Sequence, residues 1–186
     1  MTKKSLINRD TQNNKGTAVM SNNNLNSKAL PLFMQNWSEA ERTEQRLRYS
    51  CSRLHAHFPL DASDVSSGNE ELLERLDAFR VRFADLQDCI GNKLFRGVLA
   101  LEDETALTMI DLLNSMEKRR IITSVNDWRR LREIRNAFSH DYPETPEQRA
   151  AALNLAWIDH QRLHQTKQAI ADYLQRYGLT DLSKTA

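Results

Sequence analysis

The feature that most constrains the fold is a long stripe of apolar residues at helical spacing. Between about Asn69 and Ala100, large apolar side chains recur at steps of three and four: Leu72, Leu73, Leu76, Phe79, Phe83, Leu86, Ile90, Leu94 and Val98. Such steps place side chains on one face of an α-helix. The pattern therefore predicts one long amphipathic helix, which Gly91 and Gly97 are expected to bend or interrupt.

Two further helices are predicted on either side of this stripe. The first runs from about Asn36 to Phe58, because Ser38 and Glu41 have the spacing of a capping box and Pro59 cannot continue a helix. The other runs from about Glu104 to Arg120. Its inward positions are predicted to be Leu107, Ile110, Leu113 and Met116.

The last two predicted helices are separated by prolines. One starts in the segment Ser124 to Asp127, which holds good capping residues, and ends near His140, since Pro143 follows. The other runs from Pro146, a favoured first-turn residue, to Tyr177, with Gly178 as the stop.

These patterns predict an all-α protein, an antiparallel up-and-down bundle of four to five helices. The chain has only 5 Gly and 4 Pro in 186 residues, and no segment has a strand pattern. We expect a disordered, Asn-rich tail over residues 1–30 and one helical domain over 31–182. No apolar segment resembles a signal peptide or a membrane span, and the only cysteines are Cys51 and Cys89, so a cytoplasmic protein with reduced thiols is predicted.

The segment 128–140 combines a core face with unusual polar residues. On an ideal helix, one face holds Leu131, Ile134 and Phe138. A second face holds a polar column of Arg132, Asn136 and His140. Arg135 falls at the margin of the apolar face, where a guanidinium is costly unless it is paired or borders water. Arg135 and His140 diverge on one helix, so their convergence requires the helix to end at His140 or a two-fold partner to bring a second pair.

Charge is distributed unevenly along the chain. The segment 117–135 holds seven basic and three acidic residues, whereas 61–88 holds eight acidic and three basic residues, in a chain of net charge +1. The basic segment predicts an anionic ligand, and the acidic one predicts a basic partner or self-complementation. The candidate phosphate-binding residues are Arg119, Arg120, Arg129, Arg130 and Arg132.

The polar residues at the end of this helix also resemble a known motif. The pattern Arg135-Asn136-x-x-x-His140-x-Tyr142 resembles the R-N-x-x-x-H signature of the HEPN superfamily, in the form found in HepT-type toxins. The segment from Arg82 to Phe95 resembles the long second helix of the same proteins, and the resemblance covers about residues 36–177.

The resemblance implies a HEPN-like helical fold and a homodimeric, metal-independent endoribonuclease that needs no cofactor, the toxin of a type VII-like toxin–antitoxin system with tRNA among its candidate substrates. His140 would transfer protons, Arg135 would hold the scissile phosphate, and Asn136 would orient either group. The implied partner is an MntA-type minimal nucleotidyltransferase antitoxin, which would AMPylate Tyr142. The alternative is a non-catalytic HEPN module that binds or presents substrate to that nucleotidyltransferase.

Several residues that could carry a function also have a purely structural interpretation. Arg135 and His140 also fit a helix-terminal ion pair. His160 and His164 are four apart but lack the glutamate of a zinc protease motif, so a surface pair is predicted rather than a metal site. Trp128 and Trp157 are predicted to be core or interface aromatics rather than platforms for RNA bases.

Overall fold

A computed structural model describes residues 25–66, 69–139, 145–180 and 182. Most of these residues are helical, the described ranges contain no strand, and the predicted all-α bundle is confirmed. The elements are α1 (Leu30–Leu54), α2 (Glu70–Asp88), the π-helical segment η1 (Cys89–Leu94), α3 (Phe95–Leu101), α4 (Met109–Lys118), α5 (Val125–Ser139) and α6 (Pro146–Gln175).

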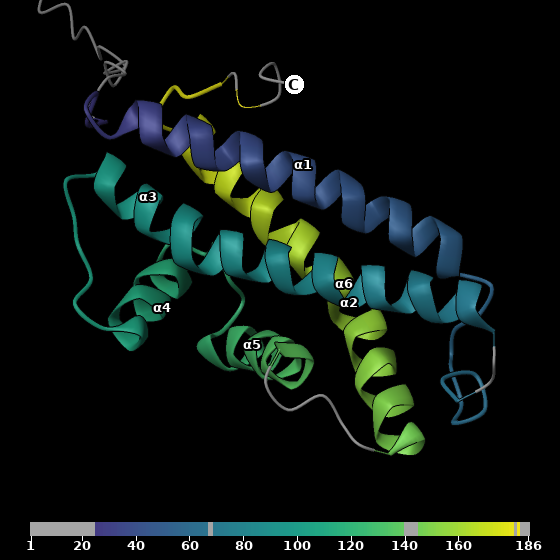
Figure 1. Ribbon diagram of the computed structural model, residues 1–186. Helices are drawn as coiled ribbons and strands as arrows, with labels where there is room; N and C mark the ends of the chain where they lie inside the picture. The colour runs from purple at the N-terminus through teal and green to yellow at the C-terminus, as the bar shows by residue number, and fades with distance from the viewer. Residues whose placement is uncertain (1–24, 67–68, 140–144, 181, 183–186) are drawn as a thin grey trace, which may run out of the picture.

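The bundle is built around the long middle helix (Figure 1). Helices α2, η1 and α3 follow one another without a break, as the apolar stripe predicts, and Asn69 caps the start by accepting a hydrogen bond from the Leu72 amide at 3.2 Å. Helix α1 runs antiparallel to α2–α3 on one side, and α4 and α5 pack on the other. Helix α6 packs against both α2 and α5.

The first helix begins earlier than predicted. Helix α1 starts at Leu30, with Pro31 in its first turn, and Ser38 lies inside it with its hydroxyl donating to the Met34 carbonyl at 3.1 Å. Residues 25–29 also belong to the packed structure, because Leu25 and Ala29 contact the core. The predicted tail boundary at residue 30 is therefore too late, while residues 1–24 lie outside the described residues.

The third predicted helix is shorter than expected. Helix α4 begins after Thr108, which forms a capping box with Asp111, so Leu107 lies before the helix and is 95% exposed. Ile110 is exposed as well, whereas Leu113 and Met116 are buried as predicted. The capping box determines the start, because its two hydrogen bonds satisfy amides that the helix leaves unpaired.

Both glycines of the middle helix allow close packing, and Gly91 also lies in the π-helical segment η1, which interrupts the α-helix as predicted, whereas Gly97 lies inside α3. An ideal Cβ on Gly97 would lie 2.8 Å from Cδ2 of Phe33, and one on Gly91 would lie 3.0 Å from Cζ2 of Trp128. Gly97 thus admits the Phe33 ring of α1, and Gly91 admits the Trp128 indole of α5. Both aromatic side chains are buried.

Helices α1 and α6 are joined by a buried polar cluster. The Glu44 carboxylate accepts hydrogen bonds from His164 Nδ1, Lys167 Nζ and Arg48 Nη2, each at 2.8 Å. The Lys167 ammonium also lies 4.5 Å from the centre of the Trp37 ring. Burial alone would raise the pKa of Glu44, but the hydrogen bonds from His164, Lys167 and Arg48 lower it to about 2.

The prediction of a surface histidine pair was wrong. His160 is buried and its Nδ1 contacts the Trp157 carbonyl at 2.5 Å, while His164 is occupied by Glu44. Burial lowers the pKa of His160, which favours the neutral ring. The spacing of the two histidines does not reveal this, because their partners on other helices are distant in the sequence. The His160 ring packs against Phe79 of α2, and His164 pairs with Glu44 of α1.

We expect Glu44 to link stability to acid. Because its folded pKa lies below its ordinary value of 4.5, its contribution is complete above that value and is lost as the pH falls toward about 2. Glu44→Gln should cost about 3 kcal/mol in urea unfolding at neutral pH, and the difference from wild type should shrink on acidification. Glu74→Gln, at an exposed position, is the control and should show no such trend. A constant difference across the acid range would contradict the assignment.

Candidate functional site

Helix α5, which carries the polar motif, begins as the sequence predicts. Ser124 accepts a hydrogen bond from the Asp127 amide at 3.0 Å and donates to the Asp127 carboxylate at 2.9 Å. The predicted core face is also found, because the three apolar residues at helical spacing are all buried: Leu131, Ile134 and Phe138. The opposite side of the helix is left for polar groups.

Helix α5 packs on the middle helix in the reverse direction. Near its start, Trp128 lies against Gly91 and its ring centroid is 4.6 Å from that of Phe95. Near its end, Phe138 meets Phe83 edge to face, with centroids 5.9 Å apart. Arg80 of α2 then donates through Nη1 to the Phe138 carbonyl at 2.7 Å, which satisfies one of the carbonyls that a helix end leaves unpaired.

Arg135 lies between these two anchors and is held by α2. Its Nε donates to Asp88 Oδ2 at 2.8 Å, its Nη2 contacts the same oxygen, and its Nη1 donates to Asn136 Oδ1 at 3.0 Å. The Asp88 side chain also accepts from Asn92 Nδ2 at 3.3 Å. The Arg135 side chain is 23% exposed, as its predicted place at the margin of the core requires.

Asp88 is the member of this cluster that sequence reasoning did not single out. It is the last residue of α2, where the chain changes to the wider π-helical turns of η1. Such local insertions occur frequently at functional sites. The only hint in the sequence was the acidic excess of residues 61–88, and the ion pair with Arg135 shows that part of this excess is neutralised within the chain.

The remaining motif residues are only partly placed. Asn136 is half-buried beside Arg135, and Arg132 is exposed one turn earlier. His140 and Tyr142, to which the motif assigns proton transfer and modification, lie outside the described residues. The structure therefore joins Asp88, Arg135 and Asn136 in one cluster.

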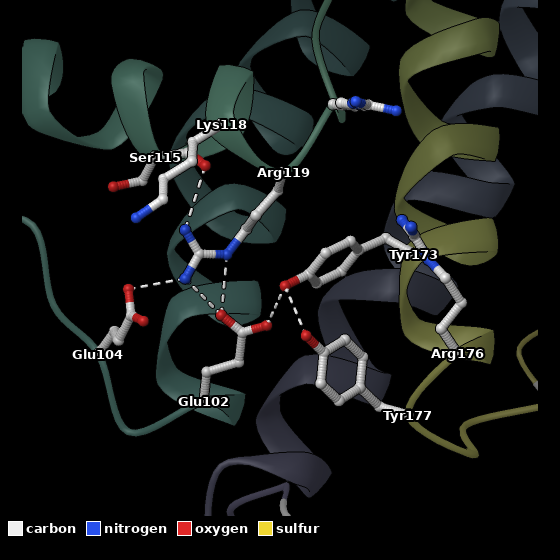
Figure 2. Close-up of a pocket in the computed structure, with 9 residues that line it drawn as sticks. Glu102, Glu104, Ser115, Lys118, Arg119, Tyr173, Arg176 and Tyr177 are labelled. Carbon is white, nitrogen blue, oxygen red and sulfur yellow. Dashed lines mark hydrogen bonds and ion pairs between the residues drawn. The ribbon is translucent and has the colours of Figure 1, made fainter.

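The five candidate phosphate-binding arginines fall into two groups. On α5, Arg129 and Arg132 are exposed, and Arg130 is paired with the buried Asp159 of α6 at 2.6 Å. Arg119 and Arg120, by contrast, line a separate pocket at the end of α4 (Figure 2). The Arg119 guanidinium is turned inward onto two glutamates there, so its main role is structural.

The two cysteines do not add a nucleophile to the site. Cys89 follows Asp88 directly, but its side chain is buried, and burial raises the pKa of its thiol to about 11. Burial raises the pKa of Cys51 to about 11 as well. Both thiols are therefore protonated near neutral pH, and the thiolate is the reactive form.

Comparison with known proteins found no match to this chain. No protein-family model matches the chain, and no curated protein or solved structure matches it significantly. Within the described ranges, none of the helices has the length and apolarity needed to cross a membrane. The same residues contain no group of three or more His, Cys, Asp or Glu side chains arranged to hold a metal ion.

Proposed function

We propose that this protein is a metal-independent endoribonuclease of the HEPN type, the toxin of a toxin–antitoxin pair, with tRNA as a candidate substrate. The observation that carries the proposal is the fixed position of Arg135. Asp88 and Asn136 hold its guanidinium at the margin of the core, on the last turns of the helix that leads to His140. An arginine held in place is suited to stabilising a phosphate whose charge grows in the transition state.

The reaction proposed is attack of a ribose 2′-oxygen on the adjacent phosphorus. The 2′-hydroxyl loses its proton to a base, the bond from phosphorus to the 5′-oxygen breaks, and that oxygen receives a proton. Imidazole is the side chain best suited to both transfers near neutral pH, so we assign them to His140. Arg129 and Arg132, exposed on the same helix, would hold the flanking phosphates.

The first test is cleavage of RNA by the purified protein in the presence of EDTA. His140→Ala and Arg135→Ala should each lose about 10²-fold or more in rate, the usual scale for an acid–base or charge-stabilising group. Asp88→Asn should lose less, because Arg135 remains but is no longer held by an ion pair. The products should carry cyclic phosphates.

Matched controls come from the end of α1, away from the motif. His55→Ala and Arg53→Ala replace an exposed imidazole and an exposed guanidinium and should leave the rate unchanged. A strict requirement for added Mg²⁺ or Zn²⁺, or full activity in His140→Ala, would reject the mechanism.

We further propose that the active form is a homodimer, with α5 near the two-fold axis. Support comes from two exposed apolar residues one turn apart on α6, Ile158 at 66% and Leu155 at 43% exposure. They lie beside Asp159, which holds Arg130 of α5. An isologous interface there would bury both residues and bring two copies of the motif together.

Sedimentation velocity at micromolar concentration tests this assembly. The wild type should sediment as a dimer, and Ile158→Glu should shift it toward monomer and reduce cleavage, because a carboxylate would be buried without a partner. Leu32→Glu, at an equally exposed apolar position on α1, is the control and should remain dimeric. A fully active wild-type monomer would argue against the dimer.

The proposed regulation is AMPylation of Tyr142 by an MntA-type minimal nucleotidyltransferase. The phenol oxygen would attack the α-phosphorus of ATP, pyrophosphate would leave, and the phenolic proton would pass to solvent. The attached AMP would place a bulky negative group two residues from His140, where it would exclude and repel RNA.

Intact mass after incubation with the nucleotidyltransferase, ATP and Mg²⁺ tests this regulation. The wild type should gain AMP units, and Tyr142→Phe should gain none and escape neutralisation. Tyr49→Phe, which removes an exposed tyrosine elsewhere, should be modified like the wild type. If Tyr142→Phe is neutralised as well as the wild type, inhibition proceeds by binding alone.

A second function, a non-catalytic partner of the nucleotidyltransferase, is favoured by one observation. The Arg135 guanidinium already pairs with Asp88, so its charge is partly used within the chain. In that case the Arg135–Asp88 pair stabilises the end of α5 and presents the following segment to the enzyme. Absence of cleavage together with modification of Tyr142 would support this function over the first.

A further inference from the structure

A second polar pocket lies where the C-terminal ends of three helices meet. Glu102 and Glu104 follow α3, Lys118 to Arg120 end α4, and Tyr173 to Tyr177 end α6 (Figure 2). The cavity has a volume of about 600 Å³, within the range of small-molecule sites. None of the residues that line it belongs to α5, so it is distinct from the Arg135 cluster.

The floor of this pocket is a fully bonded polar network. Arg119 donates from Nε to Glu102 Oε2 at 2.8 Å, from Nη2 to Glu104 at 2.7 Å, and from Nη1 to the Ser115 carbonyl at 3.1 Å. The other oxygen of Glu102 accepts from the Tyr173 hydroxyl. Arg119 therefore bonds both carboxylates and a helix-terminal carbonyl, and the network of two glutamates and one arginine keeps a net charge of −1.

The rim of the pocket carries unbalanced positive charge. Lys118, Arg120 and Arg176 are exposed, and in the part of the chain that the structure describes none of them forms an ion pair. The Arg176 guanidinium lies 5.0 Å from the centre of the Tyr173 ring. Four basic and two acidic residues line the pocket, so its net charge is +2, which favours an anionic ligand.

Arg120 has a backbone conformation that its residue type does not explain. Its φ is 59°, at the position after α4 where the Arg120 amide bonds Glu117 and the Ile121 amide bonds Met116. This is the Schellman arrangement, in which glycine is preferred. Gly178 occupies the equivalent position after α6, with φ 85°.

A third helix end, that of α3, also has a residue with positive φ. Asp103, after α3, also has a positive φ of 56°, but Asp tolerates this region and its carboxylate accepts from Asn26 at 2.6 Å. Among the described residues, Arg120 has neither a residue type that tolerates positive φ nor a side-chain hydrogen bond of this kind. A long cation kept where glycine is less strained, at the mouth of a pocket, points to a role for the side chain in binding.

Aromatic rings complete the pocket. The Tyr173 and Tyr177 rings have centroids 5.2 Å apart, and their hydroxyls lie 3.2 Å apart. Tyr173 is buried, whereas Tyr177 is 40% exposed and offers part of its ring to the cavity. A planar, electron-rich ring next to cations matches a ligand with a flat base and a phosphate.

We propose that this pocket binds a nucleoside phosphate, with the phosphate at Lys118, Arg120 and Arg176 and the base against Tyr177. A free nucleotide and a nucleotide within an RNA chain share this chemistry. The site lies outside the proposed catalytic cluster, so its occupancy is measured by binding alone and does not depend on cleavage.

Calorimetric titration tests the site with three probes: AMP, ATP and an oligoadenylate made uncleavable by 2′-O-methyl groups. Arg120→Gly should weaken binding about tenfold or more, because a charged contact is lost. The same change should maintain or raise the melting temperature, because glycine suits the backbone. Tyr177→Ala should weaken binding about fivefold or more, and Tyr177→Phe should stay near wild type, because stacking needs only the ring. Arg53→Gln removes a cation elsewhere and should bind normally.

The probes also distinguish a free nucleotide from a nucleotide within an RNA chain as the ligand. Binding of AMP or ATP without the oligonucleotide identifies a free nucleotide, and the reverse identifies RNA. Adenosine and inorganic pyrophosphate, each lacking one half of the ligand, should bind more weakly than ATP. The proposal is overturned if no probe binds at millimolar concentration, if Arg120→Gly binds like wild type, if Arg53→Gln loses affinity equally, or if either half binds as tightly as ATP.

Discussion

The close contact between α5 and the π-helical turn η1 is the constraint on which the functional part of the structure depends. Gly91 lets the Trp128 indole approach the backbone, and this fixes the start of α5. Seven residues later, two helical turns along the same side, Arg135 reaches Asp88. The end of α5 is then held through Phe138. A larger residue at Gly91 would push α5 away, and the Arg135–Asp88 pair would move with it.

Internal pairing decides which charges remain for ligands. The acidic α2 and the basic α5 neutralise each other at Asp88 and Arg135, and α5 and α6 do so at Arg130 and Asp159. Arg119 forms an ion pair with Glu102 in the same way. Among the described residues, the exposed cations without an ion pair include Arg129 and Arg132 on α5, and Lys118, Arg120 and Arg176 around the pocket at the ends of α4 and α6. Others lie elsewhere, such as Arg42 and Arg46 on α1. Because exposed cations attract phosphate more freely than paired ones, the cations on α5 and those around this pocket mark two places where an anionic ligand is expected.

Prediction from sequence was most accurate where local rules act. The long apolar stripe, the helix starts near Asn69 and Ser124 and the core face of α5 depend on spacing and on hydrogen bonds between near neighbours. Prediction from sequence failed where two local signals for a helix start competed. Ser38 has the spacing of a capping box, but Pro31 starts the helix earlier and α1 continues through Ser38. Leu107 looked like a core residue, but the Thr108 capping box leaves it outside α4.

The sequence alone determined the helical class, the order of the helices and the placement of Arg135 at the edge of an apolar face, because each follows from periodicity and from residues a few positions apart. Only the tertiary structure decided that Asp88 holds Arg135, that Glu44 of α1 pairs with His164, and that Lys118, Arg120 and Tyr177 share a pocket. These partners are 47, 120 and up to 59 residues apart in the chain. Their contact depends on how whole helices pack, and a single sequence contains no local pattern that records it.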